Sequence, residues 1–264
     1  MTADASLAGN PAARHALVTG GGRGIGAAVA ATLIAAGHHV TVTGRDREAL
    51  AATARLHADS GRCRAVVMDV GDRASVDRAM AEARAGIGPI EILVNNAGQA
   101  ESAPFQKTSA ELFERMLAVN LGGTFHCTQA ALPDMLAARW GRVINIASTA
   151  GLVGYAYVSA YCAAKHGVVG LTRALALEFA AKGITVNAVC PGYTDTDIVA
   201  QAVASIVAKT GRSEAEARAG LAKGNPMQRL VTPQEVADTV LWLCGEAAAS
   251  INGQSIAVAG GEVM

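Results

Sequence analysis

Short hydrophobic runs rich in β-branched residues alternate with longer alanine-rich stretches along nearly the whole chain. The short runs are typical of buried strands, and the apolar spacing in the longer stretches predicts helices. Regular alternation of this kind requires right-handed crossovers and gives a parallel sheet covered by helices on both faces. Strands are predicted at 14–19, 38–43, 64–68, 90–94, 141–147, 184–190 and 254–259, and helices at 24–36, 46–59, 72–85, 109–138, 158–181 and 233–244.

The pattern therefore indicates an α/β fold with a doubly wound, parallel, seven-stranded sheet in a single domain over residues 14–264. Residues 1–13 precede the first strand, lack the apolar centre of a signal peptide, and are predicted to be a flexible tail. The stretch 194–223 adds helical material after the sixth strand, and its second half is too polar to be fully buried. Ligands bind at the carboxyl ends of such strands, so this stretch is predicted to be a small, mobile helical lid.

Composition and charge exclude several classes of function. Of the 264 residues 51% are hydrophobic and only 4% aromatic, which favours a large aliphatic core of helices on a parallel sheet. The formal net charge is zero with acids and bases interspersed, which argues against nucleic-acid and acidic-lipid partners. No apolar run approaches the roughly 20 residues that span a bilayer. The five scattered cysteines predict reduced thiols in a cytoplasmic protein, with neither disulfides nor a metal site.

A glycine turn, TGGGRGIG at 19–26, joins the first strand to the first helix. Strand, turn and helix N-terminus together present free backbone N–H groups and a positive dipole end to an anion. The spacing of Gly20, Gly24 and Gly26 is G-x-x-x-G-x-G, which differs from the usual dinucleotide fingerprint. A glycine-rich loop without a ligand is the alternative, but the flanking strand and helix favour dinucleotide binding.

The tip of the second strand indicates which dinucleotide is bound. An NAD-preferring site places a carboxylate there, whereas this chain has Gly44 followed by Arg45. Glycine removes a charge that would repel a 2′-phosphate, and Arg45 with Arg23 can bind one. NADP(H) is therefore expected. Asp46 is expected to cap the next helix; if the strand is longer, Asp46 reaches the ribose and the preference turns to NAD(H).

Tyr161 and Lys165 lie four residues apart in a predicted helix, so both project from one face. An unperturbed tyrosine, with a pKa of about 10, is a poor acid–base group near neutrality. A lysine ammonium one turn away, with a nicotinamide cation nearby, is expected to lower that pKa. Ser148, just after an apolar strand, can donate a hydrogen bond to a substrate oxygen.

Motifs along the chain after residue 13 resemble, in order and spacing, those of the classical short-chain dehydrogenase/reductases. The motifs are TGGGRGIG, DV at 69–70, NNAG at 95–98, Asn120 in VNLGGTF, Ser148 in INIAST, YCAAK at 161–165 and VNAVCPG at 186–192. The resemblance implies a Rossmann-type oxidoreductase with Asn120, Ser148, Tyr161 and Lys165 as its catalytic tetrad. Tyr161 would exchange a proton with the substrate oxygen that Ser148 holds. Lys165 would bind the nicotinamide ribose, and Asn120 would position a water in the proton relay.

The same resemblance supplies the cofactor and substrate contacts. Asp69 and Val70 would flank the adenine, and loop residues Gln99, Thr149, Tyr155 and Tyr193 would shape the substrate pocket. The expected cofactor contacts are Gly20, Gly22, Arg23, Gly24, Ile25, Gly26, Gly44, Arg45, Asp69, Val70, Asn96, Ala97, Gly98, Tyr161, Lys165, Pro191, Gly192, Thr194 and Thr196.

Within the family, stretches such as KHGVVGLT and GNPMQRLVTPQEVAD are most similar to the 3-ketoacyl and aromatic polyketide ketoreductases. This similarity implies NADPH-dependent reduction of a ketoacyl thioester, on CoA or an acyl carrier, or of a polyketide-like ketone. The alternative is an NAD-dependent dehydrogenase of a hydroxyacyl-CoA or a small or cyclic secondary alcohol. A non-catalytic cofactor sensor is disfavoured because the tetrad is complete. The family also implies a homotetramer that pairs the helices at 109–138 and 158–181.

Overall fold

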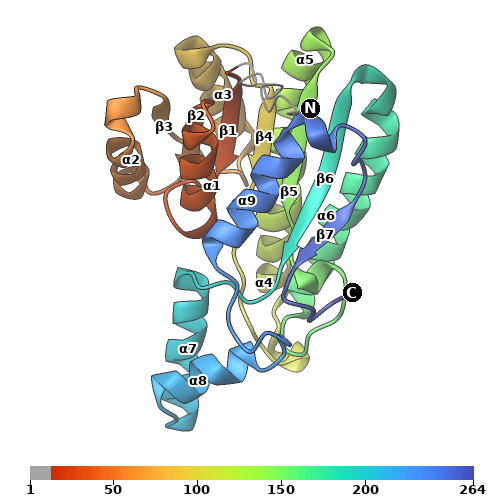
Figure 1. The fold of residues 1–264 in the computed structure, drawn as a ribbon. Helices are drawn as coiled ribbons and strands as arrows, with labels where there is room; N and C mark the ends of the chain where they lie inside the picture. The colour runs from red at the N-terminus through yellow and green to blue at the C-terminus, as the bar shows by residue number, and fades with distance from the viewer. Residues whose placement is uncertain (1–12) are drawn as a thin grey trace, which may run out of the picture.

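The computed structural model describes residues 13–264, so all but the last residue of the predicted tail lies outside the described residues. Its centre is one parallel sheet in the order β3-β2-β1-β4-β5-β6-β7, which confirms the predicted seven-stranded architecture (Figure 1). The strands are β1 His15–Thr19, β2 His39–Gly44, β3 Cys63–Val67, β4 Ile92–Asn95, β5 Gly141–Ile146, β6 Ile184–Pro191 and β7 Ser255–Val258.

The strand order reverses between β1 and β4, where Val18 lies in register with Val94 on one side and Val42 on the other. The chain winds from β1 outward to β3 and then crosses back to β4. A crevice therefore opens at the carboxyl ends of β1 and β4, which is where open α/β sheets bind ligands.

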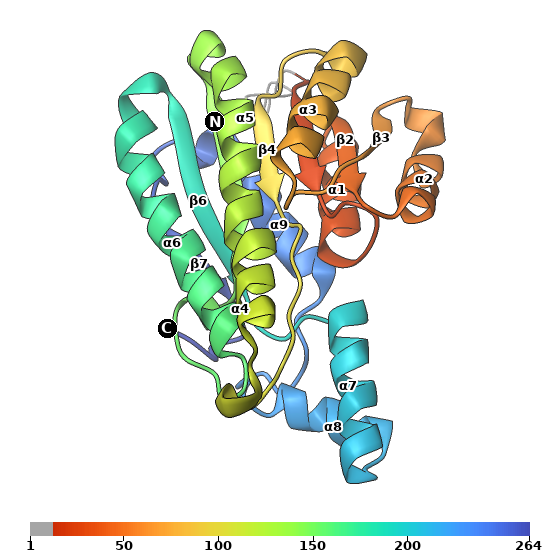
Figure 2. The same cartoon turned by 180° about the vertical axis from the view of Figure 1, so that it is seen from behind.

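Two helical layers cover the sheet. Helices α1, α2 and α9 lie on the face shown in Figure 1, and α3 to α6 cover the face shown in Figure 2. Each face has its own buried aliphatic cluster, one including Leu33 and Val240 and the other Met80 and Met135. The helices are α1 Gly24–Ala35, α2 Arg47–Leu56, α3 Arg73–Ile87, α4 Ala110–Leu117, α5 Gly123–Ala138, α6 Ser159–Phe179, α7 Asp197–Thr210, α8 Glu214–Ala222 and α9 Pro233–Cys244.

The helix predicted at 109–138 is interrupted by a wider, π-helical turn at Ala118–Gly122. Inside this turn the Asn120 side chain donates to the Met116 carbonyl at 3.0 Å, the acceptor that a regular helix reserves for the backbone N–H of residue 120. Single π-helical turns inside α-helices are frequent at functional sites. The interruption places Asn120 under the carboxyl end of the sheet.

The stretch 194–223 forms α7 and α8, which project beyond the carboxyl edge of the sheet in both views (Figures 1 and 2). The two helices share a small apolar cluster of Val199, Val203 and Ala217, so α8 packs on α7 although its outer face is polar. We call residues 194–223 the lid. Its contacts with the body include a bridge from Thr194 to Val231, Thr196 beside the glycine turn, and an exposed ion pair of Asp197 with Arg23.

We expect the lid to be mobile in the free chain and ordered by ligands, because its apolar cluster is separate from the main core. Hydrogen exchange should slow across α7 and α8 when NADPH and a product alcohol are added together. Exchange in α9, packed on the main core, should change little. Equal protection of the lid with and without these ligands would contradict the prediction.

No helix within residues 13–264 is long and apolar enough to cross a membrane.

Candidate active site

Two adjoining cavities lie at the carboxyl edge of the sheet. The first, of about 300 Å³, extends from the glycine turn to the tips of β2 and β3, and we call it the glycine-loop cavity. The second, of about 210 Å³, lies between β5, α6 and the lid and contains Tyr161, and we call it the tyrosine cavity. They share six lining residues, so one extended ligand can occupy both: Ile25, Asn96, Gly98, Gln99, Thr196 and Ile198.

Glycines are required in the turn because the backbone there is left-handed and crowded. Gly20 has φ of 65° and Gly24 of 53°, conformations that side chains rarely adopt. A Cβ on Gly20 would lie 3.0 Å from the Cα of Ala97. The turn is held to β4 by the Asn96 side-chain amide, which donates to the carbonyls of Thr19 at 2.9 Å and Gly20 at 3.1 Å.

The start of α1 has the properties of an anion site. It has no side-chain N-cap bond and no acidic residue in its first turn, so its first N–H groups are free to bind a ligand. Gly26 lines neither cavity; a Cβ there would lie 2.2 Å from the Gly20 carbonyl oxygen, so its role is close packing of α1 against the turn. These features fit the pyrophosphate of a dinucleotide.

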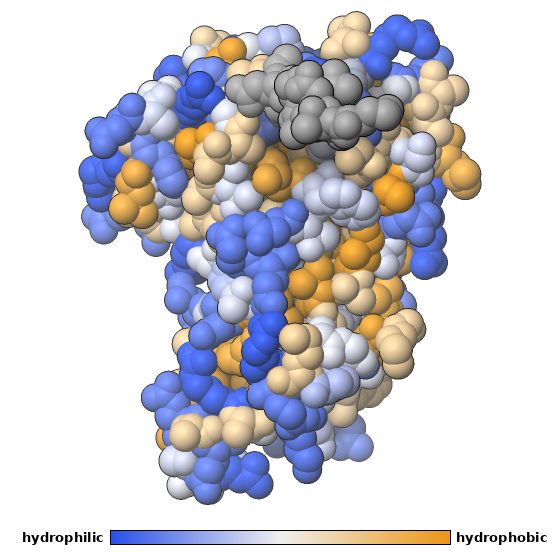
Figure 3. Space-filling view, in the orientation of Figure 1, coloured by the Kyte–Doolittle hydropathy of each residue, from blue (hydrophilic) through white to orange (hydrophobic). Residues whose placement is uncertain are grey.

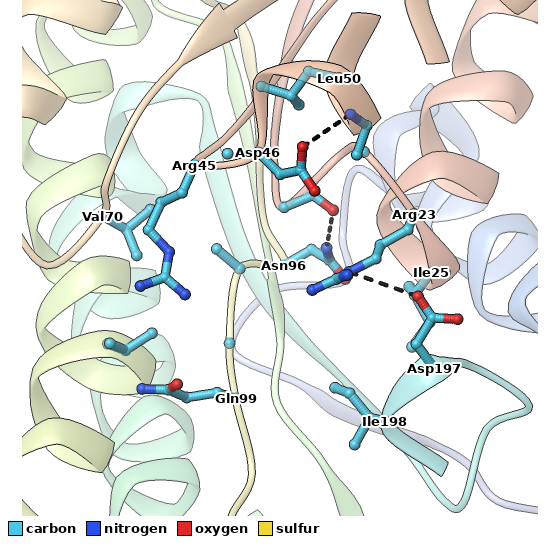
Figure 4. Close-up of a pocket in the computed structure, with 18 of the residues that line it drawn as sticks. Arg23, Ile25, Arg45, Asp46, Leu50, Val70, Asn96, Gln99, Asp197 and Ile198 are labelled. Atoms are coloured by element: carbon cyan, nitrogen blue, oxygen red, sulfur yellow. Dashed lines mark hydrogen bonds and ion pairs between the residues drawn. The ribbon is translucent and has the colours of Figure 1, made fainter. Parts of the chain in front are cut away.

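The tip of β2 lies one residue later than predicted, but Asp46 still takes the role of helix cap that the sequence suggested. β2 ends at Gly44, and Asp46 caps α2 by accepting hydrogen bonds from the backbone N–H groups of Glu48 and Ala49, both at 3.1 Å. Arg45 is exposed, lines the cavity, and has no ion-pair partner within residues 13–264. Figure 4 shows Arg45 and Arg23 extending to either side of Asp46. One oxygen of the Asp46 carboxylate, Oδ1, is therefore engaged by its own helix, and the Arg45 guanidinium is available.

Arg23 lines the same cavity but reaches towards the lid. Its Nε lies 3.7 Å from Asp197 in the first turn of α7, and both side chains are exposed (Figure 4). The convergence of Arg23 and Arg45 on one phosphate therefore requires Arg23 to leave this exposed pair, which contributes little stability.

The four candidate catalytic residues surround the tyrosine cavity. Tyr161 and Lys165 lie one turn apart on α6, with the Lys165 Nζ 5.6 Å from the centre of the tyrosine ring. The buried Lys165 donates to the Ile146 carbonyl at 2.8 Å. Ser148 follows β5, and its Oγ accepts a bond from the Ala150 N–H at 3.1 Å, which leaves its own proton free for a ligand.

Asn120 is buried and doubly bonded to the loop after β4. Its Oδ1 accepts from the Gln99 N–H at 3.2 Å and its Nδ2 donates to the Gln99 carbonyl at 3.0 Å. A Cβ on Gly98 would lie 2.7 Å from that Oδ1 and 3.6 Å from the Lys165 Nζ, so the glycine lets Asn120 approach Lys165. The structure thus brings the Asn120 amide and the Lys165 ammonium to one corner of the cavity.

The pKa of Tyr161 differs from the sequence-based expectation. Burial raises the pKa of Tyr161 to about 12, and the hydrogen bond with Ser148 opposes that shift. Burial also lowers the pKa of Lys165 to about 8. The expected lowering of the tyrosine pKa is therefore not produced by the chain alone, because the ammonium is directed to the Ile146 carbonyl. At neutral pH Tyr161 holds its proton, which suits a proton donor.

All four residues expected to shape the substrate pocket, Gln99, Thr149, Tyr155 and Tyr193, line the tyrosine cavity. The Tyr155 hydroxyl contacts Thr149 Oγ1 at 2.9 Å and Glu262 Oε1 at 2.6 Å. Glu262 was not predicted from the sequence, because nothing in the terminal tail indicates that it folds back to this wall.

Other lining residues were also missed. Asp197 and Ile198 follow directly after the expected contact Thr196, so the lid's first turn could have been included on position alone. Val119 enters through the π-helical turn, for which the sequence carries no clear signal. The remaining expected cofactor contacts, apart from Gly26, line one cavity or the other. Within residues 13–264 no three His, Cys, Asp or Glu side chains are grouped to hold a metal ion.

Comparisons with known proteins agree over nearly the full chain. A family model described as short chain dehydrogenase matches residues 14–206. The D-beta-hydroxybutyrate dehydrogenase of Rhizobium meliloti (strain 1021) is 36% identical over 252 residues, 94% of this chain and 98% of that protein. The 3-oxoacyl-acyl-carrier-protein reductase of Aquifex aeolicus (strain VF5) is 38% identical over 247 residues, 93% and 95% of the two chains. A crystal structure of a variant of actinorhodin polyketide ketoreductase with NADPH has a TM-score of 0.91 at 37% identity, covering 95% of this chain and 97% of that chain.

Proposed function

The chain belongs to the short-chain dehydrogenase family of oxidoreductases, and from this premise we propose that it uses NADP(H) to reduce a ketone to a secondary alcohol. The proposed substrate is a 3-ketoacyl thioester or a polyketide-like ketone. The observation that carries the proposal is the continuity of two sites: a glycine turn beside Arg45 that suits a phosphate, and a cavity lined by both Ser148 and Tyr161.

The chain's residues would divide the chemistry as follows. When bound, a reduced nicotinamide supplies a hydride to the carbonyl carbon. Ser148 donates its free proton to the ketone oxygen and holds it next to Tyr161. Tyr161 transfers its proton to that oxygen as negative charge develops, and acts in reverse for alcohol oxidation. The Lys165 ammonium would bind the nicotinamide ribose and stabilise the Tyr161 phenolate after proton transfer. The Asn120 amide would position the water that returns a proton to Tyr161.

The preference for NADP(H) is supported by the β2 tip. Gly44 places no charge there, the Asp46 carboxylate caps α2, and Arg45 is free to form a charge-assisted bond with a 2′-phosphate. The alternative, an NAD-dependent dehydrogenase of a hydroxyacyl-CoA or cyclic alcohol, would need a carboxylate free to bind the ribose hydroxyls. The use of Asp46 Oδ1 as the cap of α2, together with the Arg45 guanidinium beside it, disfavours this alternative.

The thioester substrate is supported by the relatives, one of which is named a 3-oxoacyl-acyl-carrier-protein reductase and another a polyketide ketoreductase. A tyrosine cavity of about 210 Å³ suits the keto end of such a substrate. The rest of the thioester would extend out of the cavity towards the lid. A CoA or acyl-carrier thioester is accordingly the proposed partner, in the cytoplasm, where the five free thiols would remain reduced.

The test is a substrate screen with purified protein. NADPH oxidation should be measured with ketoacyl thioesters, cyclic ketones and quinones, each repeated with NADH. The proposal predicts turnover of the thioesters with kcat/KM at least about tenfold higher for NADPH than for NADH. Turnover of alcohols with NAD alone would replace it with the alternative.

We propose a homotetramer, because two apolar surfaces would otherwise face water. Leu177 on α6 is 85% exposed, and Phe113 and Phe125 add exposed rings on the same layer (Figure 2). Figure 3 shows a second set of apolar side chains over β7, beside α9. Large apolar side chains exposed on one layer of a fold are candidates for burial in a subunit interface.

Sedimentation should give a tetramer at micromolar concentration. The Leu177→Glu variant should sediment as a smaller species, because the new carboxylate would be buried at the proposed interface. Glu82→Gln, an exposed change on α3, is the control and should remain tetrameric. A wild-type monomer at micromolar concentration would contradict the proposal.

A further inference from the structure

One wall of the tyrosine cavity contains a three-residue hydrogen-bond chain. The Tyr155 hydroxyl lies 2.6 Å from Glu262 Oε1 and 2.9 Å from Thr149 Oγ1. Tyr155 and Thr149 line the cavity, whereas Glu262 lies behind them. A Cβ on Gly192, another lining residue, would lie 2.8 Å from Glu262 Oε2, so the carboxylate is directly behind the cavity surface.

A tight turn after β7 brings Glu262 to this position. Gly260 and Gly261 have φ of 60° and 91°, and the Glu262 N–H closes the turn on the Ala259 carbonyl at 3.1 Å. A Cβ on Gly260 would lie 2.1 Å from the Oδ1 of Asn225, a buried residue just after the lid. Both glycines are therefore required for the tail to fold back, and the placement of Glu262 is built into the fold.

The directions of these hydrogen bonds follow from counting protons. An ionised carboxylate only accepts, so Tyr155 donates its single proton to Glu262. Thr149 must then donate its proton to the Tyr155 oxygen. Both hydroxyl protons are thus used in hydrogen bonds within this three-residue chain. The two oxygens therefore present only acceptor lone pairs to a ligand.

The charges around the cavity also disfavour an anionic ligand. Of the described residues that line it, Lys165 is the one cationic side chain, and it is directed to the Ile146 carbonyl at the cofactor side. The Glu262 carboxylate is also the second cause, after burial, that raises the pKa of Tyr193 on the same wall. A substrate carboxylate beside Tyr155 and Thr149 would therefore meet a negative charge, and neither hydroxyl would have a proton to donate to it.

We propose that Glu262, acting through Tyr155 and Thr149, makes the site select ketones that are uncharged near the reacting carbon, as a 3-ketoacyl thioester is, and reject free keto acids. This inference rests on the proposed ketone reduction. It assigns a specificity-determining role to a residue of the C-terminal tail that contacts the cavity wall and does not touch the reacting atoms.

Three small ketones with one skeleton test the proposal: acetoacetamide, which is neutral with an N–H donor, methyl acetoacetate, which is neutral without one, and acetoacetate, which is anionic. With NADPH, wild-type kcat/KM should be higher for both neutral ketones than for acetoacetate. Glu262→Gln keeps a hydrogen-bonding group of the same size but removes the charge. It should reduce the ratio of kcat/KM for acetoacetamide to kcat/KM for acetoacetate about tenfold or more, mainly by lowering KM for acetoacetate. Glu262→Asp should keep most of the ratio, and Glu82→Gln should keep all of it.

A binding measurement separates this inference from the proposed reaction. With saturating NADPH, calorimetry should show 3-hydroxybutyramide binding more tightly than 3-hydroxybutyrate, a complex in which no hydride can be transferred. Selective binding without turnover of any ketone would overturn the proposed reaction and support the role of Glu262. Equal or tighter binding of the acid, absence of binding by the amide, or an unchanged ratio in Glu262→Gln would overturn the inference.

Discussion

Replacing Tyr161 with phenylalanine is expected to lower kcat by about 10²–10⁴-fold while the affinity for NADPH stays within about twofold. The ring and its place on α6 are retained, and the change removes only the hydroxyl in the cavity that Ser148 also lines. Steady-state kinetics with a ketone and fluorescence titration of NADPH measure the two quantities.

The matched control is Tyr157→Phe, which removes a hydroxyl from an exposed tyrosine four residues earlier that lines neither cavity. It should leave kcat nearly unchanged. If Tyr161→Phe keeps more than about a tenth of the activity, another group transfers the proton and the assigned role is wrong.

Arg45→Ala is expected to weaken NADPH binding by roughly ten- to a hundredfold and to leave NADH binding unchanged. A charge-assisted hydrogen bond to a phosphate contributes on the order of 1.5–3 kcal/mol, which corresponds to that range. Arg55→Ala, at the exposed end of α2, is the control and should change neither affinity. Arg23→Ala should give a smaller loss, because Arg23 must first leave Asp197.

Gly44→Asp is expected to reverse the preference. A Cβ at Gly44 would lie 3.6 Å from the nearest Leu50 atom, an ordinary contact, so the substitution fits without displacing α2. The new carboxylate would repel a 2′-phosphate and accept hydrogen bonds from the ribose of NADH. Retention of NADPH affinity in Arg45→Ala, or tighter NADH binding by the wild type, would show that the β2 tip has been misassigned.

The sheet and most helices could be predicted from sequence because their signals are local. The apolar runs that became β1, β2, β5 and β6 were predicted to within one residue at each end. The helix cap by Asp46 was predicted for the same reason, because a helix cap depends on neighbouring residues alone. The motifs around Ser148, Tyr161 and Lys165 placed all three on one cavity.

The features that escaped prediction depend on contacts between distant segments. The π-helical turn at Asn120 arises from side-chain bonds to Met116 and to the loop at Gln99. The raised pKa of Tyr161 reflects burial under elements far apart in the sequence. Glu262 reaches Tyr155 across more than a hundred residues, through a turn that only packing against Asn225 reveals.

Transfer of a labelled hydride tests the central claim most directly. NADPH deuterated at the transferable position should be incubated with a 3-oxoacyl thioester and the wild-type protein, and the product examined by mass spectrometry. The account predicts a 3-hydroxyacyl thioester with one deuterium on the carbinol carbon, formed much more slowly when deuterated NADH is used. An unlabelled alcohol, no alcohol, or equal labelling from NADH would contradict it.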